Sequence, residues 1–149
     1  GRVRIGARSS IWPGTVVRGD VHEIAIGDET NVQDLSCLHV LKDRFSLTLG
    51  NRVSVGHAVT LHGCTIGDLC LIGMRATVMD DVEIGAESLV AAGALVTPGT
   101  KIPPRSLVMG SPAKVKREVN AAELELLHRT WKNYVDYARR YVERFGRGF

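Results

Sequence analysis

The sequence predicts an all-β solenoid, a parallel β-helix of hexapeptide repeats, followed by one C-terminal α-helix. The first observation is an aliphatic residue that recurs every six positions and is often followed by glycine. The second is a change of pattern after Ser111-Pro112, where apolar residues begin to recur at three- and four-residue steps. We therefore expect residues 1–113 to form the β-helix. Residues 114–149 should form a linker and a helix. The helix should pack on the triangular prism that the β-helix forms, or on a neighbouring subunit.

The six-residue period is the primary signal. A helix cannot use it, because six residues do not return to one face at 3.6 residues per turn, and an alternating strand would show a period of two. A hexapeptide repeat is typical of a parallel β-helix, in which each hexad supplies one short strand and a corner. The inward aliphatic positions are expected to be Ile5, Ile11, Val17, Ile26, Val32, Leu38, Leu49, Val55, Leu61, Ile66, Ile72, Val78, Ile84, Val90, Val96, Ile102 and Val108.

Two segments interrupt this period, and they are expected to be corner loops. The first break runs from Val17 to Ile26 and the second from Leu38 to Leu49. Insertions in solenoids lie on one face, which is often the functional face. We place the second loop within residues 40–48, so that the flanking hexads keep their order around the coil.

The second break brings two histidines together. With the loop removed, Leu38 and Leu61 occupy the same side of the prism, one coil apart. His39 and His62 directly follow them. Because stacked parallel strands lie about 4.8 Å apart, we expect these two histidines to be neighbours that point the same way.

A third histidine lies on the preceding side. His57 follows Val55 by two positions, and Gln33 and Asp34 follow Val32 on that same side. The chain would thus carry two half-sites that flank one edge. The first half-site contains His39 and His62, and the second contains His57, Gln33 and Asp34. A threefold trimer would bring the first half-site of one chain against the second half-site of the next. Three histidine nitrogens with an open fourth position are typical of a catalytic zinc site.

The C-terminal segment predicts one amphipathic helix. Asn120 followed by Glu123 is a capping-box pattern. The helix should extend from Ala121 to Phe145 and end at Gly146. Its apolar stripe consists of Leu124, Leu127, Trp131, Tyr134, Ala138, Tyr141 and Phe145.

Composition narrows the functional classes. The formal net charge of +3 is too small to indicate nucleic-acid binding. No apolar run approaches the roughly 18 residues of a membrane span, so no membrane partner is expected. The three cysteines form no CxxC pair, which favours reduced thiols and a cytoplasmic protein.

Several of these segments together resemble the signature of the γ-class carbonic anhydrases. They are Arg18-Gly19-Asp20, Thr30-Asn31-Val32-Gln33-Asp34, Leu38-His39, Gly56-His57 and Leu61-His62-Gly63-Cys64. The resemblance covers nearly the whole chain. It implies a left-handed β-helix, a homotrimer, and reversible hydration of carbon dioxide to bicarbonate at a zinc site, with Fe(II) or cobalt as other metals for the same ligands.

The resemblance also implies residue roles. His39 and His62 would bind the metal from one subunit and His57 from the adjacent one. Two polar groups would contact the reacting molecules: Gln33 would hydrogen-bond the metal-bound solvent, and Tyr134 matches a tyrosine that many short family members place near the metal. Arg18 would pair with Asp34 across the subunit interface, with support from Asp20.

The chain departs from the archetype at two points linked to proton transfer. The position directly after Asp20 is Val21 instead of an acidic residue, and the loop after His39 is short and carries only Asp43 as an acidic group. His22 is the competing candidate for a proton shuttle, because imidazole titrates near neutral pH.

Two further functions stay open at this stage. The first is a coenzyme A thioester hydrolase or acyltransferase, because Ile102 to Lys116, with Gly110-Ser111-Pro112-Ala113, resembles the C-terminal coil of such hexapeptide proteins. The second is a non-catalytic trimeric module that retains zinc for its structure.

Overall fold

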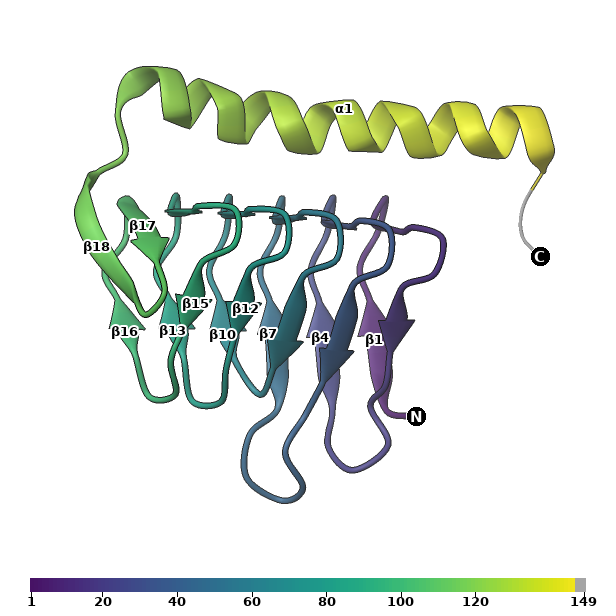
Figure 1. The fold of residues 1–149 in the computed structure, drawn as a ribbon. Coiled ribbons are helices and arrows are strands. Elements are labelled where there is room, and N and C mark those ends of the chain that lie inside the picture. Colours follow the sequence, from purple (N-terminus) through teal and green to yellow (C-terminus); the bar gives the residue numbers. More distant parts are fainter. Residues whose placement is uncertain (147–149) are drawn as a thin grey trace.

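The protein is a triangular stack of short parallel strands with one long helix alongside it (Figure 1). The computed structural model describes residues 1–146. The remaining residues of the expected helical unit, 147–149, lie outside the described part. The strands form three walls, and the chain visits the first, second and third wall in turn before it begins the next coil. This arrangement confirms the expected parallel β-helix.

The first wall contains six parallel strands. In spatial order they are β1 (Val3–Ile5), β4 (Ile24–Ile26), β7 (Leu47–Leu49), β10 (Thr65–Ile66), β13 (Glu83–Ile84) and β16 (Lys101–Ile102).

The second wall contains six parallel strands and one antiparallel strand. They are β2 (Ser10–Ile11), β5 (Asn31–Val32), β8 (Ser54–Val55), β11 (Leu71–Ile72), β14 (Leu89–Val90), β17 (Ser106–Gly110) and the antiparallel β18 (Ala113–Glu118). The sequence predicts a linker followed by a helix in residues 114–149, whereas the chain first turns back and pairs β18 with β17.

The third wall contains five parallel strands. They are β3 (Val16–Val17), β6 (Cys37–His39), β9 (Thr60–His62), β12 (Thr77–Val78) and β15 (Leu95–Val96). Leu38 of β6 lies in register with Leu61 of β9, as the interpretation of the second break requires.

The core is a column of aliphatic side chains inside the three walls. Leu38, Val55, Leu61 and Ile72 are fully buried, and most of the other expected inward positions are buried as well. Ile5 and Ile11 of the first coil are exceptions, since both are exposed. Two thiols share this interior, and burial raises the pKa of both Cys64 and Cys70 to about 12. Burial of apolar surface in the coils that follow the first stabilises the stack of strands.

The helix α1 (Ala121–Phe145) begins and ends where the sequence pattern predicts. Asn120 and Glu123 form the expected capping box, and Gly146 is the C-cap. Arg117 and the Asn120 backbone N–H lower the pKa of the Glu123 carboxyl to about 2. Within the described chain, α1 is not long and apolar enough to cross a membrane.

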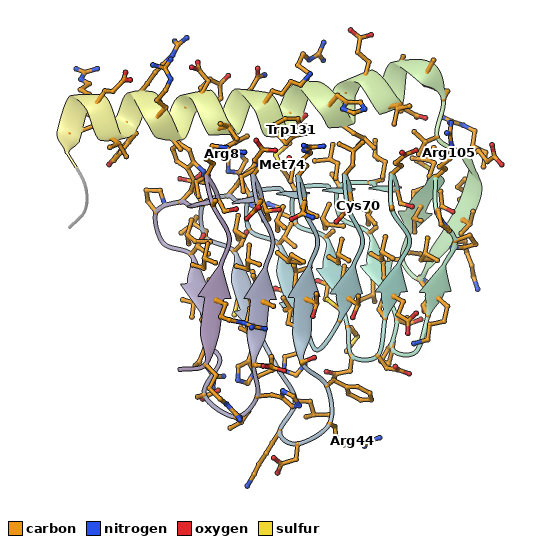
Figure 2. The ribbon with its side chains drawn as sticks, turned by 180° about the vertical axis from the view of Figure 1, so that it is seen from behind. Arg8, Arg44, Cys70, Met74, Arg105 and Trp131 are labelled. Carbon is orange, nitrogen blue, oxygen red and sulfur yellow. The ribbon has the colours of Figure 1, made fainter. Side chains whose placement is uncertain are left out.

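The helix runs along the second wall, over β2, β5 and β8 (Figure 1). The Leu127 side chain of this helix is buried, and Trp131 points toward the coils (Figure 2). The Arg52 guanidinium lies 5.1 Å from the centre of the Trp131 ring. The loop that carries Arg44 projects from the opposite side of the prism, so the helix and this loop do not compete for the same face (Figure 2).

Candidate metal centre

His39 and His62 face each other at the edge where the third wall meets the first. They are register partners at the ends of β6 and β9, and their ring centres lie 5.1 Å apart. His39 Nδ1 lies 3.1 Å from His62 Nε2. The two loops predicted from the breaks in the period begin at this edge, directly after β3 and β6.

Each of these histidines also contacts a carboxylate through its second ring nitrogen. His39 Nε2 lies 3.0 Å from Asp20 Oδ1, and His62 Nδ1 lies 2.7 Å from Asp80 Oδ1. Arg18 is paired with the other oxygen of Asp20. The hydrogen bond to His39, supported by the Arg18 guanidinium, lowers the pKa of the Asp20 carboxyl to about 2. Asp20 is therefore an anion throughout the neutral range.

The second half-site lies where the second wall meets the third. His57 Nδ1 lies 3.0 Å from Asp34 Oδ2. The Gln33 side chain is almost fully buried, and its Nε2 donates to Asn31 Oδ1 at 3.1 Å. Asn31 in turn donates to Ser54 Oγ at 2.9 Å. This chain of hydrogen bonds fixes the orientation of the Gln33 amide.

Tyr134 reaches the second half-site from α1. It lines a pocket of about 330 Å³ together with Gln33 and His57. Its ring contacts Trp12 edge to face, with ring centres 5.4 Å apart. Burial, with a smaller contribution from the negative charge of Asp34, raises the pKa of the Tyr134 phenol. Its hydroxyl is therefore a neutral hydrogen-bonding group at physiological pH.

The two half-sites lie at opposite edges of the third wall, so they do not flank a single edge as the sequence interpretation expected. In residues 1–146, no three His, Cys, Asp or Glu side chains converge to hold a metal ion. Arg18 and Asp34 likewise occupy different half-sites in this chain, where their partners are Asp20 and His57.

The donor set nevertheless fits a divalent cation. Two ligand nitrogens at 2.0–2.1 Å from one tetrahedral zinc ion lie about 3.3 Å apart. The separation of 3.1 Å between His39 and His62 is close to that value. Histidines that bind metals usually give their second nitrogen to a carboxylate, a carbonyl or water. His39, His62 and also His57 each do so here.

Sequence reasoning missed Asp80. The register of the third wall could have revealed it, because Leu61 pairs with Val78 and thus places the residues after Val78 beside His62. Val21 has a hydrocarbon side chain with no titratable group, and it is partly buried against the aliphatic core. His22 Nδ1 accepts a hydrogen bond of 2.8 Å from the Glu23 backbone N–H.

Comparisons with known proteins agree with this architecture. Residues 63–98 match the model of the bacterial transferase hexapeptide family, which describes six repeats. The chain is 42% identical to a carbonic anhydrase of Geobacillus kaustophilus, and the match covers 95% of this chain and 77% of that protein. It is 39% identical to the mitochondrial γ carbonic anhydrase 2 of Arabidopsis thaliana over the whole of this chain. The chain spans 55% of the length of that plant relative.

A solved structure is also similar. The hexapeptide transferase family protein of Anaplasma phagocytophilum superimposes with a TM-score of 0.90 at 38% sequence identity. The superposition covers 95% of this chain and 82% of that one.

Proposed function

Because this chain belongs to the γ-class carbonic anhydrase-like family, we propose that it catalyses zinc-dependent, reversible hydration of carbon dioxide to bicarbonate at sites shared between the subunits of a homotrimer. The observation that carries the proposal is the pair His39 and His62, whose facing nitrogens are 3.1 Å apart at one edge of the third wall. His57 occupies the opposite edge. A third ligand would therefore come from a neighbouring copy.

The ligand set matches the chemistry that hydration requires. A bound zinc ion supplies water of lowered pKa, and hence a nucleophile near neutral pH. Neutral imidazoles leave the charge of the cation undiminished, which favours that acidification. The same nitrogens suit Fe(II) or cobalt, so the ligand set by itself does not select zinc.

Gln33 and Tyr134 are the groups we assign to the reacting molecules. The Gln33 amide donates one N–H to Asn31. Its second N–H is available to donate to a bicarbonate oxygen or a water, and its carbonyl oxygen is available to accept from a water. Tyr134 lines the same pocket and offers a neutral hydroxyl. We assign to Arg18 and Asp34 an ion pair across the subunit interface, while Asp20 orients the His39 ring.

The proton released by hydration must leave this site. Val21 occupies the position of the archetypal acidic residue and packs against the core, so it cannot carry a proton. His22 is the nearest alternative in the sequence. Without a shuttle, proton export depends on external buffer, and kcat should rise with buffer concentration while kcat/KM for carbon dioxide changes little.

The proposal is tested by stopped-flow hydration of carbon dioxide with zinc-loaded and metal-stripped protein. We expect activity in the loaded wild type, loss of activity in His57→Ala, and near wild-type activity in His128→Ala. His128 is the matched control, because it is an exposed histidine of α1. A zinc-loaded wild type that hydrates carbon dioxide no faster than loaded His57→Ala would refute the proposal.

A second candidate function is acyl transfer to or from coenzyme A. It is supported by the similarity to a hexapeptide transferase family protein and by the match to the transferase hexapeptide model. The two functions differ in their dependence on the histidines, since metal-based hydration requires all three. Acetyl-coenzyme A turnover that survives complete removal of metal would favour the acyltransferase. A metal-loaded trimer without either activity would favour a non-catalytic module.

We also propose a cytoplasmic setting with no nucleic-acid or membrane partner. The support is the small net charge and three cysteines that form no disulfide in residues 1–146. Localisation of the full-length protein by fractionation of its native cells tests this setting.

A further inference from the structure

We infer that Asp80 is a positioning residue for the metal centre, because its carboxylate fixes the ring of His62 so that Nε2 faces His39. The inference rests on the proposed function in one respect, namely that His62 is a metal ligand. It concerns a residue one coil beyond the histidines, outside the signature segments that indicated the family.

The contact between Asp80 and His62 is the tightest of the three histidine–carboxylate contacts. Asp80 Oδ1 lies 2.7 Å from His62 Nδ1, whereas Asp20 and Asp34 lie 3.0 Å from their histidines. The Asp80 side chain is 25% exposed, compared with 45% for Asp20 and 40% for Asp34. Less water competes for this hydrogen bond, so Asp80 should constrain its histidine more strongly than the other two carboxylates do.

The glycine after His62 leaves the space that the carboxylate occupies. A Cβ at Gly63 would lie 2.4 Å from Asp80 Oδ1 and 2.8 Å from the Cβ of Phe45. Gly63 has a φ of +52°, a left-handed conformation that glycine adopts without strain. Its carbonyl accepts from the Asp81 backbone N–H at 2.9 Å, which ties the two coils together beside the carboxylate.

The chemistry of the two groups determines the tautomer of His62. An ionised carboxylate only accepts hydrogen bonds, so Nδ1 of His62 must carry the proton and donate the hydrogen bond to Asp80. Nε2 then has a free lone pair, and this is the atom that faces His39 at 3.1 Å. A metal ligand needs such an unprotonated nitrogen, and a partner on the other nitrogen also makes the ligand more basic.

The first test measures zinc affinity by competition with a chromophoric chelator. Loss of an outer-shell partner typically costs 10–100-fold in metal affinity, so Asp80→Ala should weaken zinc binding by about that factor. Asp80→Asn should weaken zinc binding less than Asp80→Ala, because its amide oxygen can still accept from Nδ1, whereas its NH2 group can also donate to Nδ1 and favour the other tautomer. Asp80→Glu keeps the charge but moves the carboxylate by one methylene from its place beside Gly63 and His62, and should resemble Asp80→Ala.

The matched control is Asp81→Ala. Asp81 is the adjacent aspartate and pairs with Lys101 Nζ at 3.0 Å, with no histidine contact. If Asp81→Ala weakens zinc binding as much as Asp80→Ala, the effect is one of general charge and the inference is overturned. The same holds if Asp80→Glu binds zinc as tightly as the wild type.

The second test does not depend on activity or metal. Nitrogen-15 NMR of the metal-free protein at about pH 8.5, well above the reference pKa of imidazole, reports which ring nitrogen of His62 carries the proton. We expect the Nδ1–H form in the wild type and in Asp81→Ala, and a mixture of tautomers in Asp80→Ala. An Nε2–H form in the wild type would overturn the inference even if the protein hydrates carbon dioxide. An inactive protein with the Nδ1–H form would refute the proposed function and leave the tautomer assignment standing.

Discussion

Complementation between two variants that we expect to be inactive tests the proposed shared site most directly. His39 and His62 lie together in one chain, whereas His57 lies at the opposite edge of the third wall. His39→Ala and His57→Ala homotrimers should each lack every intact site. In a mixed trimer, a site is restored wherever the first half-site of a His57→Ala chain meets the second half-site of a His39→Ala chain.

The expected recovery follows from counting interfaces. In an equimolar random mixture, each half-site is intact in half of the chains. About one quarter of all interfaces should therefore combine two intact half-sites in a cyclic trimer with head-to-tail contacts. Zinc content and hydration rate, measured after joint unfolding and refolding, should both return to about a quarter of the wild-type values.

A matched mixture excludes nonspecific rescue. His39→Ala and His62→Ala damage the same half-site, so no combination of these chains contains an intact first half-site. This mixture should recover nothing. The reasoning is refuted if the first mixture also recovers nothing while refolded wild type regains its zinc. It is equally refuted if both mixtures recover equally.

Three further perturbations test other parts of the structure. Leu61→Ala removes a fully buried side chain of β9, directly before His62, and should lower the free energy of unfolding by about 2–5 kcal/mol in urea titrations. Val16→Ala, at a half-exposed site, should change it little. The folded-state pKa of Glu123 is lowered to about 2 from an ordinary value of 4.5, first by Arg117 and then by the Asn120 backbone N–H. The stability from these two contacts is therefore complete above about pH 4.5 and is lost as the pH falls toward 2. Glu123→Gln should therefore flatten the pH dependence of helix stability by circular dichroism in this range, and an unchanged slope would contradict the assignment. His22→Ala should leave a buffer-dependent kcat unchanged; if it abolishes a buffer-independent rate, His22 is the shuttle.

The sequence was sufficient to predict the solenoid, because each coil needs the same pattern of residues. An inward aliphatic residue is needed at every level, and the expected positions fall in strands of the three walls. The alignment of His39 with His62 followed from the same rule, since the break before Leu49 could be removed as a loop. The helix was also predictable from the sequence, because its capping box and apolar stripe are local patterns.

The features that the sequence did not reveal depend on contacts between coils or on the backbone alone. β18 has a mostly exposed surface and no inward period, so its pairing with β17 left no apolar signal. Asp80 contacts a histidine 18 residues earlier in the chain. The separation of the half-sites by a whole wall was implicit in the spacing, because His57 follows a residue of the second wall whereas His39 and His62 follow residues of the third. The expectation that both half-sites flank one edge did not carry that step through.

The loop after His39 has a consequence for how related sites can be found and altered. His39 and His62 are separated by 23 residues, whereas the same step of one coil from Leu61 to Val78 takes only 17. The additional length forms a bulge outside the prism and leaves the pairing of β6 with β9 intact. Grafting a longer or shorter segment between Leu41 and Phe45, which already bridge the base of the loop, should therefore change what surrounds the histidines without moving them. A search that fixes the spacing between the two histidines would discard family members that differ only in this bulge, whereas a search that counts coils would retain them.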